Sequence, residues 1–353
     1  MGDMKYFKIF DSTQKAILNE LRITEALLNE ICYQLNHKEG NAEIIGLEDL
    51  GIANNVVRMQ GGFFTGMYAS WSSDIPFIPI DATINACGVS IFHIPNPLDP
   101  KEFCEKLNTV KKYYKGNKSW NLDAGNHFII LCEDTTDNKQ YLVIHASHID
   151  YKYGDKGLYP TNDVWYSNNI YKIEKGNRFI RYIYGDTAEH FYNLYLEAER
   201  LNNERNLSFA TELLGNDNCI PELYVPHYGM PDISSIAIGC QWMQGDVILL
   251  SAPSKNIYVL ENCNTEKNLF PHGMGSKIKG DCQIKYNKDG LYINGQSLEV
   301  GDFLKSDFVE TRFGNELIDK SFVNKFLGHR NIKVKKEFRQ LFSDSRHGIL
   351  FNF

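Results

Sequence analysis

The sequence predicts an α+β fold, a single domain in which mixed β-sheets are flanked by helices. Apolar runs of strand length and amphipathic helical stretches are interspersed, without the regular strand–helix alternation of parallel α/β proteins. No repeat or low-complexity linker divides the 353 residues, and an apolar content of 43% is ample for one large core. We therefore expect one domain over residues 1–353.

The first expected helix covers about residues 12–36. Ser12 or Thr13 can act as its N-cap, because a hydroxyl can accept a hydrogen bond from a free backbone N–H of the first turn. Apolar residues follow at helical spacing, namely Ile17, Leu21, Leu28, Ile31 and Leu35. This pattern predicts an amphipathic helix with one face against the core.

Two further helices are expected from their terminal residues. One begins at Asp99-Pro100, since Asp is a good N-cap and Pro is tolerated at the first helical position, and Gly116 ends it. The other covers about residues 187–214 and stops at Gly215.

Short apolar runs between the helices predict strands. The polar residues 134–138 separate two of these runs and are typical of a hairpin connection. The predicted strands cover residues 77–80, 89–93, 128–132, 141–145, 247–251 and 257–260.

The charge balance argues against a protein that coats nucleic acid generally, because 44 acidic side chains outnumber 37 basic ones. Any RNA contact must come from a local basic patch, and residues 101–118 and 325–339 are the two candidates. Taken alone, each patch is more typical of a solvated helix face.

The eight cysteines include no CxxC pair and are typical of a reducing compartment rather than of a disulfide framework. The first ten residues lack the apolar segment of a signal peptide, and no run of 18 apolar residues occurs. We therefore expect a cytoplasmic protein without membrane contact, and we take it to be a monomer.

Histidine positions are the most informative feature for function. His127 begins a predicted strand and His145 ends another, while His227 and His272 lie beside prolines and glycines. Cys87 stands at the mouth of a further strand. Imidazoles with one thiolate suit Mn, Zn or Fe, but the residues are far apart in sequence, so only long-range folding could unite them. Taken singly, each is also typical of a structural histidine or a small apolar cysteine.

Five segments resemble motifs of the RtcB-type RNA ligases, both in their residues and in their order along the chain. Residues 84–89 match an Asp-Ile-Asn-Cys-Gly-Val type segment, and residues 125–128 match Gly-Asn-His-Phe in full. His145 closes a hydrophobic strand and His227 follows the long helix, as histidines of that family do. Residues 272–276 resemble the His-Gly-Ala-Gly-Arg segment.

The resemblance implies a single RtcB-like domain, with family-like motifs in residues 50–280 and a divergent C-terminal part in residues 281–353. It implies an enzyme of RNA repair or tRNA splicing that joins an RNA 3′-phosphate or 2′,3′-cyclic phosphate to a 5′-hydroxyl through a guanylylated histidine. The cofactors would be two Mn²⁺ ions, or Zn²⁺ or another divalent metal, and GTP. The partners would be RNA ends and the nucleotide.

Site residues follow from the same resemblance, residue by residue. His272 would be the nucleophile that attacks the α-phosphate of GTP. The metal ligands would be Cys87, His127, His145 and His227, with Asp81 as the nearest carboxylate. The nucleotide would contact Asn126, Ser251, Ser254, Gly273 and Gly275.

Several family positions differ in this chain. The aspartate ligand is replaced by Ile84, so Asp81 could serve only through an inserted residue or a bulge. The guanine-reading glutamate is replaced by Ile130, and Glu133 lies further along the strand with a different reach. Ser276 replaces the arginine that ends the His-Gly segment. The sequence thus keeps most of the metal ligands and the nucleophile, while most of the guanine-reading residues are lost.

Three other hypotheses stay open. One is a metal-dependent phosphoesterase that processes RNA ends with water, and another is a degenerate ligase that binds RNA or metal without turnover. A third is a metal-free protein in which the histidines are structural. Within the ligase hypothesis, the nucleotide could be GTP, ATP or none.

Overall fold

The computed structural model describes residues 5–38, 40–53, 55–115, 121–251, 255–263, 268–288, 290–298, 308–313 and 320–352. Most of its strands belong to one large sheet. They are β1 (Lys5–Tyr6), β2 (Glu43–Gly51), β3 (Thr65–Ser70), β5 (Cys87–Ile94), β6 (Phe128–Asp134), β7 (Gln140–Ala146), β10 (Ile220–Gly229), β11 (Ser235–Ile238), β13 (Gly245–Leu249), β14 (Ile257–Asn262), β21 (Ile332–Ser345) and β22 (Gly348–Phe351).

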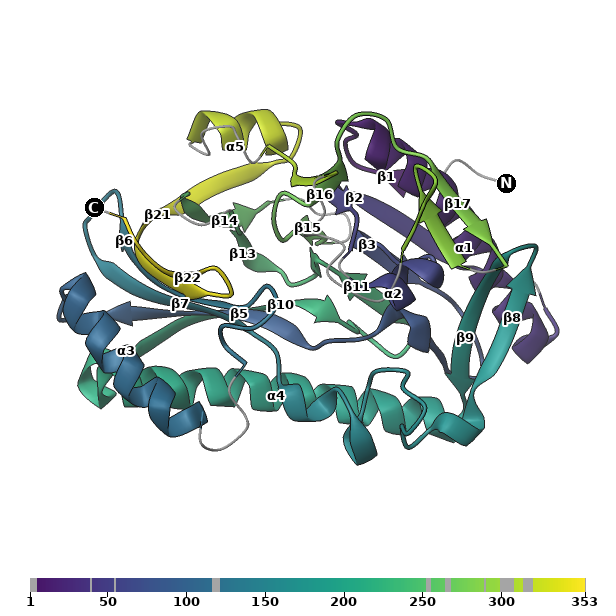
Figure 1. Cartoon of the computed structure of the whole chain (residues 1–353), viewed down its shortest axis with the longest axis horizontal. Helices are drawn as coiled ribbons and strands as arrows, with labels where there is room; N and C mark the ends of the chain where they lie inside the picture. The colour runs from purple at the N-terminus through teal and green to yellow at the C-terminus, as the bar shows by residue number, and fades with distance from the viewer. Residues whose placement is uncertain are drawn as a thin grey trace.

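This 12-stranded sheet has the order β1-β2-β3-β11-β10-β5-β7-β6-β21-β14-β13, with β22 beside β21. β1 and β2 are parallel, whereas the other described pairs of the sheet are antiparallel. The large mixed sheet and the helices around it (Figure 1) confirm the predicted α+β class.

Smaller sheets and the helices complete the described chain. The small-sheet strands are β4 (Phe77–Pro79), β8 (Tyr171–Lys175), β9 (Arg178–Tyr184), β12 (Cys240–Gln241), β15 (Phe270–Pro271), β16 (Ser276–Ile278), β17 (Ile284–Asn287), β18 (Gly290–Ile293), β19 (Gln296–Ser297) and β20 (Val309–Thr311). The α-helices are α1 (Ser12–Asn36), α2 (Val56–Gln60), α3 (Pro100–Lys115), α4 (Asp186–Leu214) and α5 (Lys320–Leu327). Short 3₁₀ helices are η1 (Ile80–Ala82), η2 (Ile149–Tyr151), η3 (Gly154–Lys156), η4 (Ser167–Asn169) and η5 (Asn216–Asn218).

The three expected helices are present, with one correction. Asp11, rather than Ser12 or Thr13, caps α1, because its carboxylate accepts a hydrogen bond from the backbone N–H of Gln14 at 3.0 Å. Asp99 caps α3 as predicted, accepting from the backbone N–H of Lys101 at 2.8 Å.

The C-terminal ends of the two later helices have different outcomes. Gly215 ends α4 with φ +86°, a backbone conformation that glycine tolerates best, and its N–H donates to the carbonyl of Thr211 at 2.8 Å. Gly116, expected to end α3, lies outside the described residues.

Each predicted strand is found within a residue or two of its expected bounds. The polar residues 134–138 connect β6 and β7, which pair as an antiparallel hairpin. The strands β2, β3, β10 and β21 were not predicted, although β21 is the longest strand in the described chain.

The basic segment 325–339 is mostly strand, because β21 occupies much of it, and this corrects its interpretation as a helix face. One of its cations, Arg330, is buried and forms an ion pair with Glu48 at 2.5 Å. The other basic segment, residues 101–118, lies on α3 as far as residue 115. Its Lys111 is paired with two aspartates rather than free for RNA.

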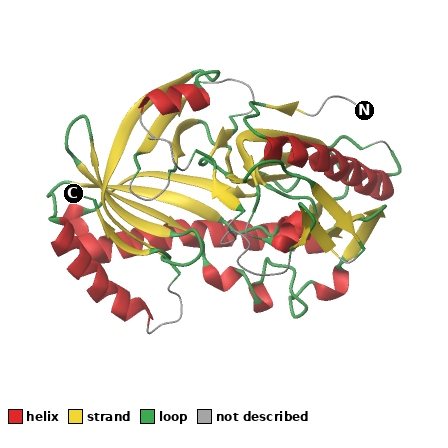
Figure 2. Ribbon diagram, turned by 45° about the horizontal axis from the view of Figure 1, so that its top comes forward, coloured by secondary structure: helices red, strands yellow, loops and turns green. Residues whose placement is uncertain are grey.

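Helices lie on the outer side of the strands (Figures 1 and 2), and α4 runs lengthwise against β5, β7 and β10. The two largest apolar clusters lie around α1, β2, β3 and the first half of α4, and around α3, β6, β7 and the second half of α4. Cys87 belongs to the first cluster and Ala146 to the second, so the clusters meet where β5 begins and β7 ends. None of the helices in the described segments is both long and apolar enough to cross a membrane.

Candidate metal centre

The centre is built on three adjacent strands, β10, β5 and β7. Val89 of β5 pairs directly with His145 of β7, so their side chains project from the same face of the sheet. Cys87 lies two residues before Val89 and shares that face, because side chains alternate along a strand. Strand register therefore brings the thiol and the first imidazole together.

His227 joins the same group from β10, at a β-bulge. On β10, Pro226 pairs with Gly88 and Tyr228 pairs with Cys87, which leaves His227 as the extra residue between successive pairs. Val225, two residues earlier, pairs with Val89, so alternation along β10 already places His227 on the face of Cys87, and the bulge falls at that position.

The ligand atoms of these three residues converge. Sγ of Cys87 lies 3.0 Å from Nε2 of His145, which lies 3.1 Å from Nε2 of His227, and the ligand atoms are all within 4.8 Å of one another. Nδ1 of His145 faces the backbone carbonyl of Asn126 at 2.9 Å. Since Nδ1 must carry the proton for that bond, Nε2 presents its lone pair to the group. Cys87, His145 and His227 could hold a metal ion.

Burial keeps the group uncharged without a cation. It raises the pKa of the Cys87 thiol to about 12 and lowers the pKa of His145 to about 3, with His272 adding to the latter effect. Burial and the neighbouring His145 also hold the pKa of His227 well below its usual value. Unprotonated ring nitrogens that face a sulfur are a donor set that fits a divalent cation, which would in turn favour the thiolate.

His127 was predicted as a further ligand and lies next to this group without joining it. Its ring centroid is 5.6 Å from that of His145. Nδ1 contacts the carbonyl of Asn121 at 2.8 Å, and Nε2 is 3.2 Å from the hydroxyl of Ser147. With Nδ1 donating, Nε2 accepts from the hydroxyl, and its lone pair is directed at Ser147 rather than at Cys87.

Asp81, the predicted carboxylate ligand, needs correction. It lies on η1, fully buried, and accepts hydrogen bonds from the backbone N–H of Arg181 at 2.7 Å and from its guanidinium Nε at 2.8 Å. The carboxylate is thus neutralised by a cation of β9 and does not belong to the group of Cys87, His145 and His227. No bulge brings it to them.

His272, the predicted nucleophile, stands beside the centre. Its ring stacks on that of His227, with centroids 5.1 Å apart and planes at 18°. Nδ1 lies 2.7 Å from Oδ2 of Asp49, a carboxylate on β2 that is fully buried. In the neutral ring, an Nδ1–H that donates to Asp49 leaves the lone pair on Nε2, and 16% of the side chain is exposed. The ring is held in the tautomer that a nucleophile at Nε2 requires.

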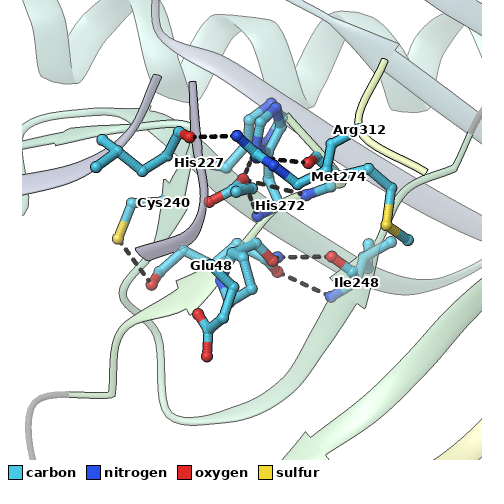
Figure 3. A network of polar contacts seen from close by, with 12 residues as sticks. Glu48, His227, Cys240, Ile248, His272, Met274 and Arg312 are labelled. Carbon is cyan, nitrogen blue, oxygen red and sulfur yellow. Dashed lines mark hydrogen bonds and ion pairs between the residues drawn. The ribbon is translucent and has the colours of Figure 1, made fainter. Parts of the chain in front are cut away.

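The loop that carries His272 is held from several sides (Figure 3). The buried guanidinium of Arg312 donates to the carbonyls of Met274 and Leu50 at 3.0 and 2.8 Å. The carbonyl of His272 accepts from the backbone N–H of Leu250 at 2.8 Å. At Gly239, with φ +60°, an added Cβ would lie 2.8 Å from Cε1 of His272, so a larger residue would push the ring away.

The predicted nucleotide contacts have mixed outcomes. Asn126 and Gly275 line the same cavity as His272, and the N–H of Gly273 points to Asp49 at 3.4 Å. Ser251 follows β13 and is not among the residues lining that cavity, while Ser254 lies outside the described residues.

Neither Ile130 nor Glu133 offers a guanine contact. Ile130 is buried in an apolar cluster between the strands, and Glu133 forms an ion pair with Arg339 at 2.8 Å. The structure therefore agrees with the loss of a guanine-reading carboxylate at these positions.

A cavity of about 460 Å³ opens beside the centre and is lined by His127 and His272. Small-molecule sites commonly measure about 300–1,000 Å³, so a nucleotide-sized group can be accommodated. Arg58 and Lys152 also line the cavity and make its wall basic.

Sequence reasoning missed Asp49 and Arg312. Asp49 follows Glu48 inside the mostly apolar strand β2, where both carboxylates are buried. Two acidic residues in an apolar strand indicate that each carboxylate needs a hydrogen-bond donor or a cation from elsewhere in the chain. Arg312 gave no comparable signal, since its contacts come from Asp11, β2 and the His272 loop, which are distant from it in sequence.

The chain matches no protein-family model, and no curated protein matches it in sequence at a significant level. The site geometry and the motif resemblance are therefore what a functional proposal rests on.

Proposed function

We propose that this chain is a metal-dependent RNA ligase of the RtcB type, joining RNA 3′-phosphate or 2′,3′-cyclic phosphate ends to 5′-hydroxyl ends through a nucleotidylated His272. One observation carries the proposal: Asp49 holds His272 in the nucleophilic tautomer, 2.7 Å away, against a buried Cys-His-His group. The five motif segments in family order support it.

The chain's own residues account for the first step. Nε2 of His272 attacks the α-phosphorus of the nucleotide, a P–N bond forms, and the bond to the bridging oxygen breaks so that pyrophosphate leaves. The imidazole gains positive charge as the bond forms, and the carboxylate of Asp49 stabilises that charge. We take GTP as the nucleotide, because the resemblance implies it.

Two Mn²⁺ ions would be held by Cys87, His145 and His227, with His127 supplying a ligand once its ring turns from Ser147. When bound, such ions offset negative charge that develops on phosphoryl oxygens. The free thiol at Cys87 supports a cytoplasmic, reducing location, since an oxidised cysteine would not serve as a ligand.

The test is covalent labelling. The full chain loaded with Mn²⁺ is incubated with α-labelled GTP or ATP, and acid-labile, base-stable label on the protein is measured. We expect label on the wild type and on the control His347→Ala, whose side chain is exposed on the β21–β22 turn. His272→Ala should carry none. Unlabelled wild type, or label that survives His272→Ala, would refute the proposal.

A second function is favoured by one observation, the burial of Ile130 where a guanine-reading glutamate is expected. The chain could be a metal-dependent phosphoesterase that removes a terminal phosphate from RNA and needs no nucleotide. Release of inorganic phosphate from a 3′-phosphorylated oligoribonucleotide, with no protein label under the conditions above, would select this function over ligation.

A further inference from the structure

Arginines buried in the described chain divide into two kinds. Arg178, Arg312 and Arg330 each form an ion pair with a carboxylate, at 2.5 to 2.6 Å. Arg58 is equally buried, with 6% exposed, yet no carboxylate of the described residues lies within ion-pair distance of it. Burying a cation without a counter-charge is costly, so its retention calls for an anion from outside the chain.

The hydrogen bonds of Arg58 leave part of its guanidinium unused. Nε donates to the carbonyl of Ala82 at 3.0 Å and to the hydroxyl of Thr83 at 2.9 Å, and Nη2 donates to the carbonyl of Thr83 at 3.1 Å. The guanidinium lies over the ring of Tyr228, 4.4 Å from its centroid. Nη1 makes no hydrogen bond to a described residue, although Arg58 lines the cavity beside His272.

Lys152 is a second cation of the same kind. It lines the cavity and is half-buried, and its ammonium group, 5.8 Å from the ring centroid of Tyr159, has no ion pair or hydrogen bond with any residue that the structure describes. Burial lowers the pKa of Lys152, and the nearby guanidinium groups of Arg205 and Arg58 lower it further, although Cys87 acts in the opposite direction. Two cations without a counter-ion among the described residues therefore line this cavity.

We propose that Arg58 and Lys152 form an anion subsite that binds a terminal phosphomonoester of the substrate. A phosphomonoester carries close to two negative charges and three free oxygens, which matches two cations with unused donors. An internal phosphodiester has one charge and chain on both sides. Arg58 and Lys152 line the same cavity as His272, so a terminal phosphate held there would share that cavity with the proposed nucleophile.

This inference deepens the proposed function, because it assigns residues to hold a terminal phosphate at that site. The phosphate could belong to an RNA 3′ end or to the nucleoside triphosphate, whose terminal group has the same chemistry. The two sources are distinguished by titrating them separately.

The test measures binding by calorimetry with the metal-loaded full chain carrying His272→Ala, so that no chemistry occurs. Two oligoribonucleotides that differ only in a 3′-phosphate are compared, and GTP is titrated separately. Lys152→Gln and Arg58→Gln are each added to this background. The matched control is Lys156→Gln, which removes an exposed lysine on the same segment that pairs with Glu197.

We expect at least one phosphate-bearing ligand to bind the His272→Ala parent more tightly than the phosphate-free oligoribonucleotide does. The affinity of that ligand should fall about tenfold or more with Lys152→Gln, as expected for the loss of a charge-assisted hydrogen bond. Lys156→Gln should bind as the parent does. An effect on the 3′-phosphate identifies the RNA end as the source, and an effect on GTP alone identifies the nucleotide.

Unchanged affinity of Lys152→Gln for both ligands would overturn the subsite, even if Arg58→Gln fails to fold, because the side chain of Lys152 has no hydrogen bond to a described residue to lose. Protein labelling in the wild type does not depend on this result. If the wild type is not labelled but Lys152→Gln weakens phosphate binding, the ligase proposal alone is refuted. If the wild type is labelled but Lys152→Gln binds both ligands as the parent does, the subsite alone is refuted.

Discussion

Replacing Asp49 by asparagine should slow nucleotidyl transfer to His272 while leaving the metal ligands in place. Oδ2 of Asp49 accepts from Nδ1–H of His272 at 2.7 Å and from the backbone N–H groups of His272 and Gly273 at 3.2 and 3.4 Å. Oδ1 is buried and makes no hydrogen bond to a described residue. The substitution keeps the side-chain shape but removes the charge and makes one terminal atom a donor.

Two orientations of the new amide set the range of the effect. If its oxygen faces His272, the hydrogen bonds remain without the charge, and the difference between charged and neutral bonds is about 1–2 kcal/mol, or about 5- to 30-fold in rate. If its nitrogen faces His272, donors oppose donors and the ring must carry its proton on Nε2. A misplaced tautomer costs about 10⁴-fold in Ser-His-Asp enzymes. We therefore expect a loss between about fivefold and 10⁴-fold.

The assay is the rate of label transfer at saturating nucleotide, read beside the metal content and the ¹⁵N shifts of His272, which report its tautomer. The matched control is Asp74→Asn, an exposed aspartate that pairs with Lys38. A wild-type rate for Asp49→Asn would contradict a role for the carboxylate in orienting the ring. Loss of bound metal in proportion to the lost rate would mean that Asp49 supports the fold of the centre instead.

The affinity for the metal should fall in Cys87→Ala by more than about 10- to 100-fold, the loss typical when a residue that contacts a metal ligand is replaced. Asp81→Asn should keep its metal, because the carboxylate of Asp81 pairs with Arg181. Equal losses of bound metal in the two variants, measured by mass spectrometry, would contradict this difference. Glu48→Gln should lower the free energy of unfolding by about 3–5 kcal/mol in urea titrations at neutral pH, because it leaves Arg330 buried without its counter-charge. Although burial opposes ionisation of Glu48, hydrogen bonds from His329 and Arg330 outweigh it and lower its pKa below 4.5. The stabilisation by the Glu48 carboxylate should thus be present above that value and be lost as the pH falls through the lowered pKa. If the free energy of unfolding changes with acid pH by the same amount in the wild type and in Glu48→Gln, this prediction is wrong.

The sequence alone determined the local elements and the residue types of the centre. Asp99 and Pro100 predicted the start of α3, and Gly215 predicted the end of α4, because capping and periodicity depend on residues that are neighbours in the chain. The motif order singled out Cys87 and His145, which the structure does bring together.

Tertiary structure decided which side chains meet. His227 lies beside the thiol because β10 pairs with β5, and since side chains alternate along a strand, a shift of one residue in that pairing would move its side chain to the opposite face. Asp49 and His272 are 223 residues apart and meet because β2 passes beside the His272 loop. Asp81 was assigned to the metal by sequence proximity to Cys87, but pairing of β4 with β9 presents Arg181 to it instead. Such contacts depend on strand pairing between distant segments, which local sequence patterns do not specify.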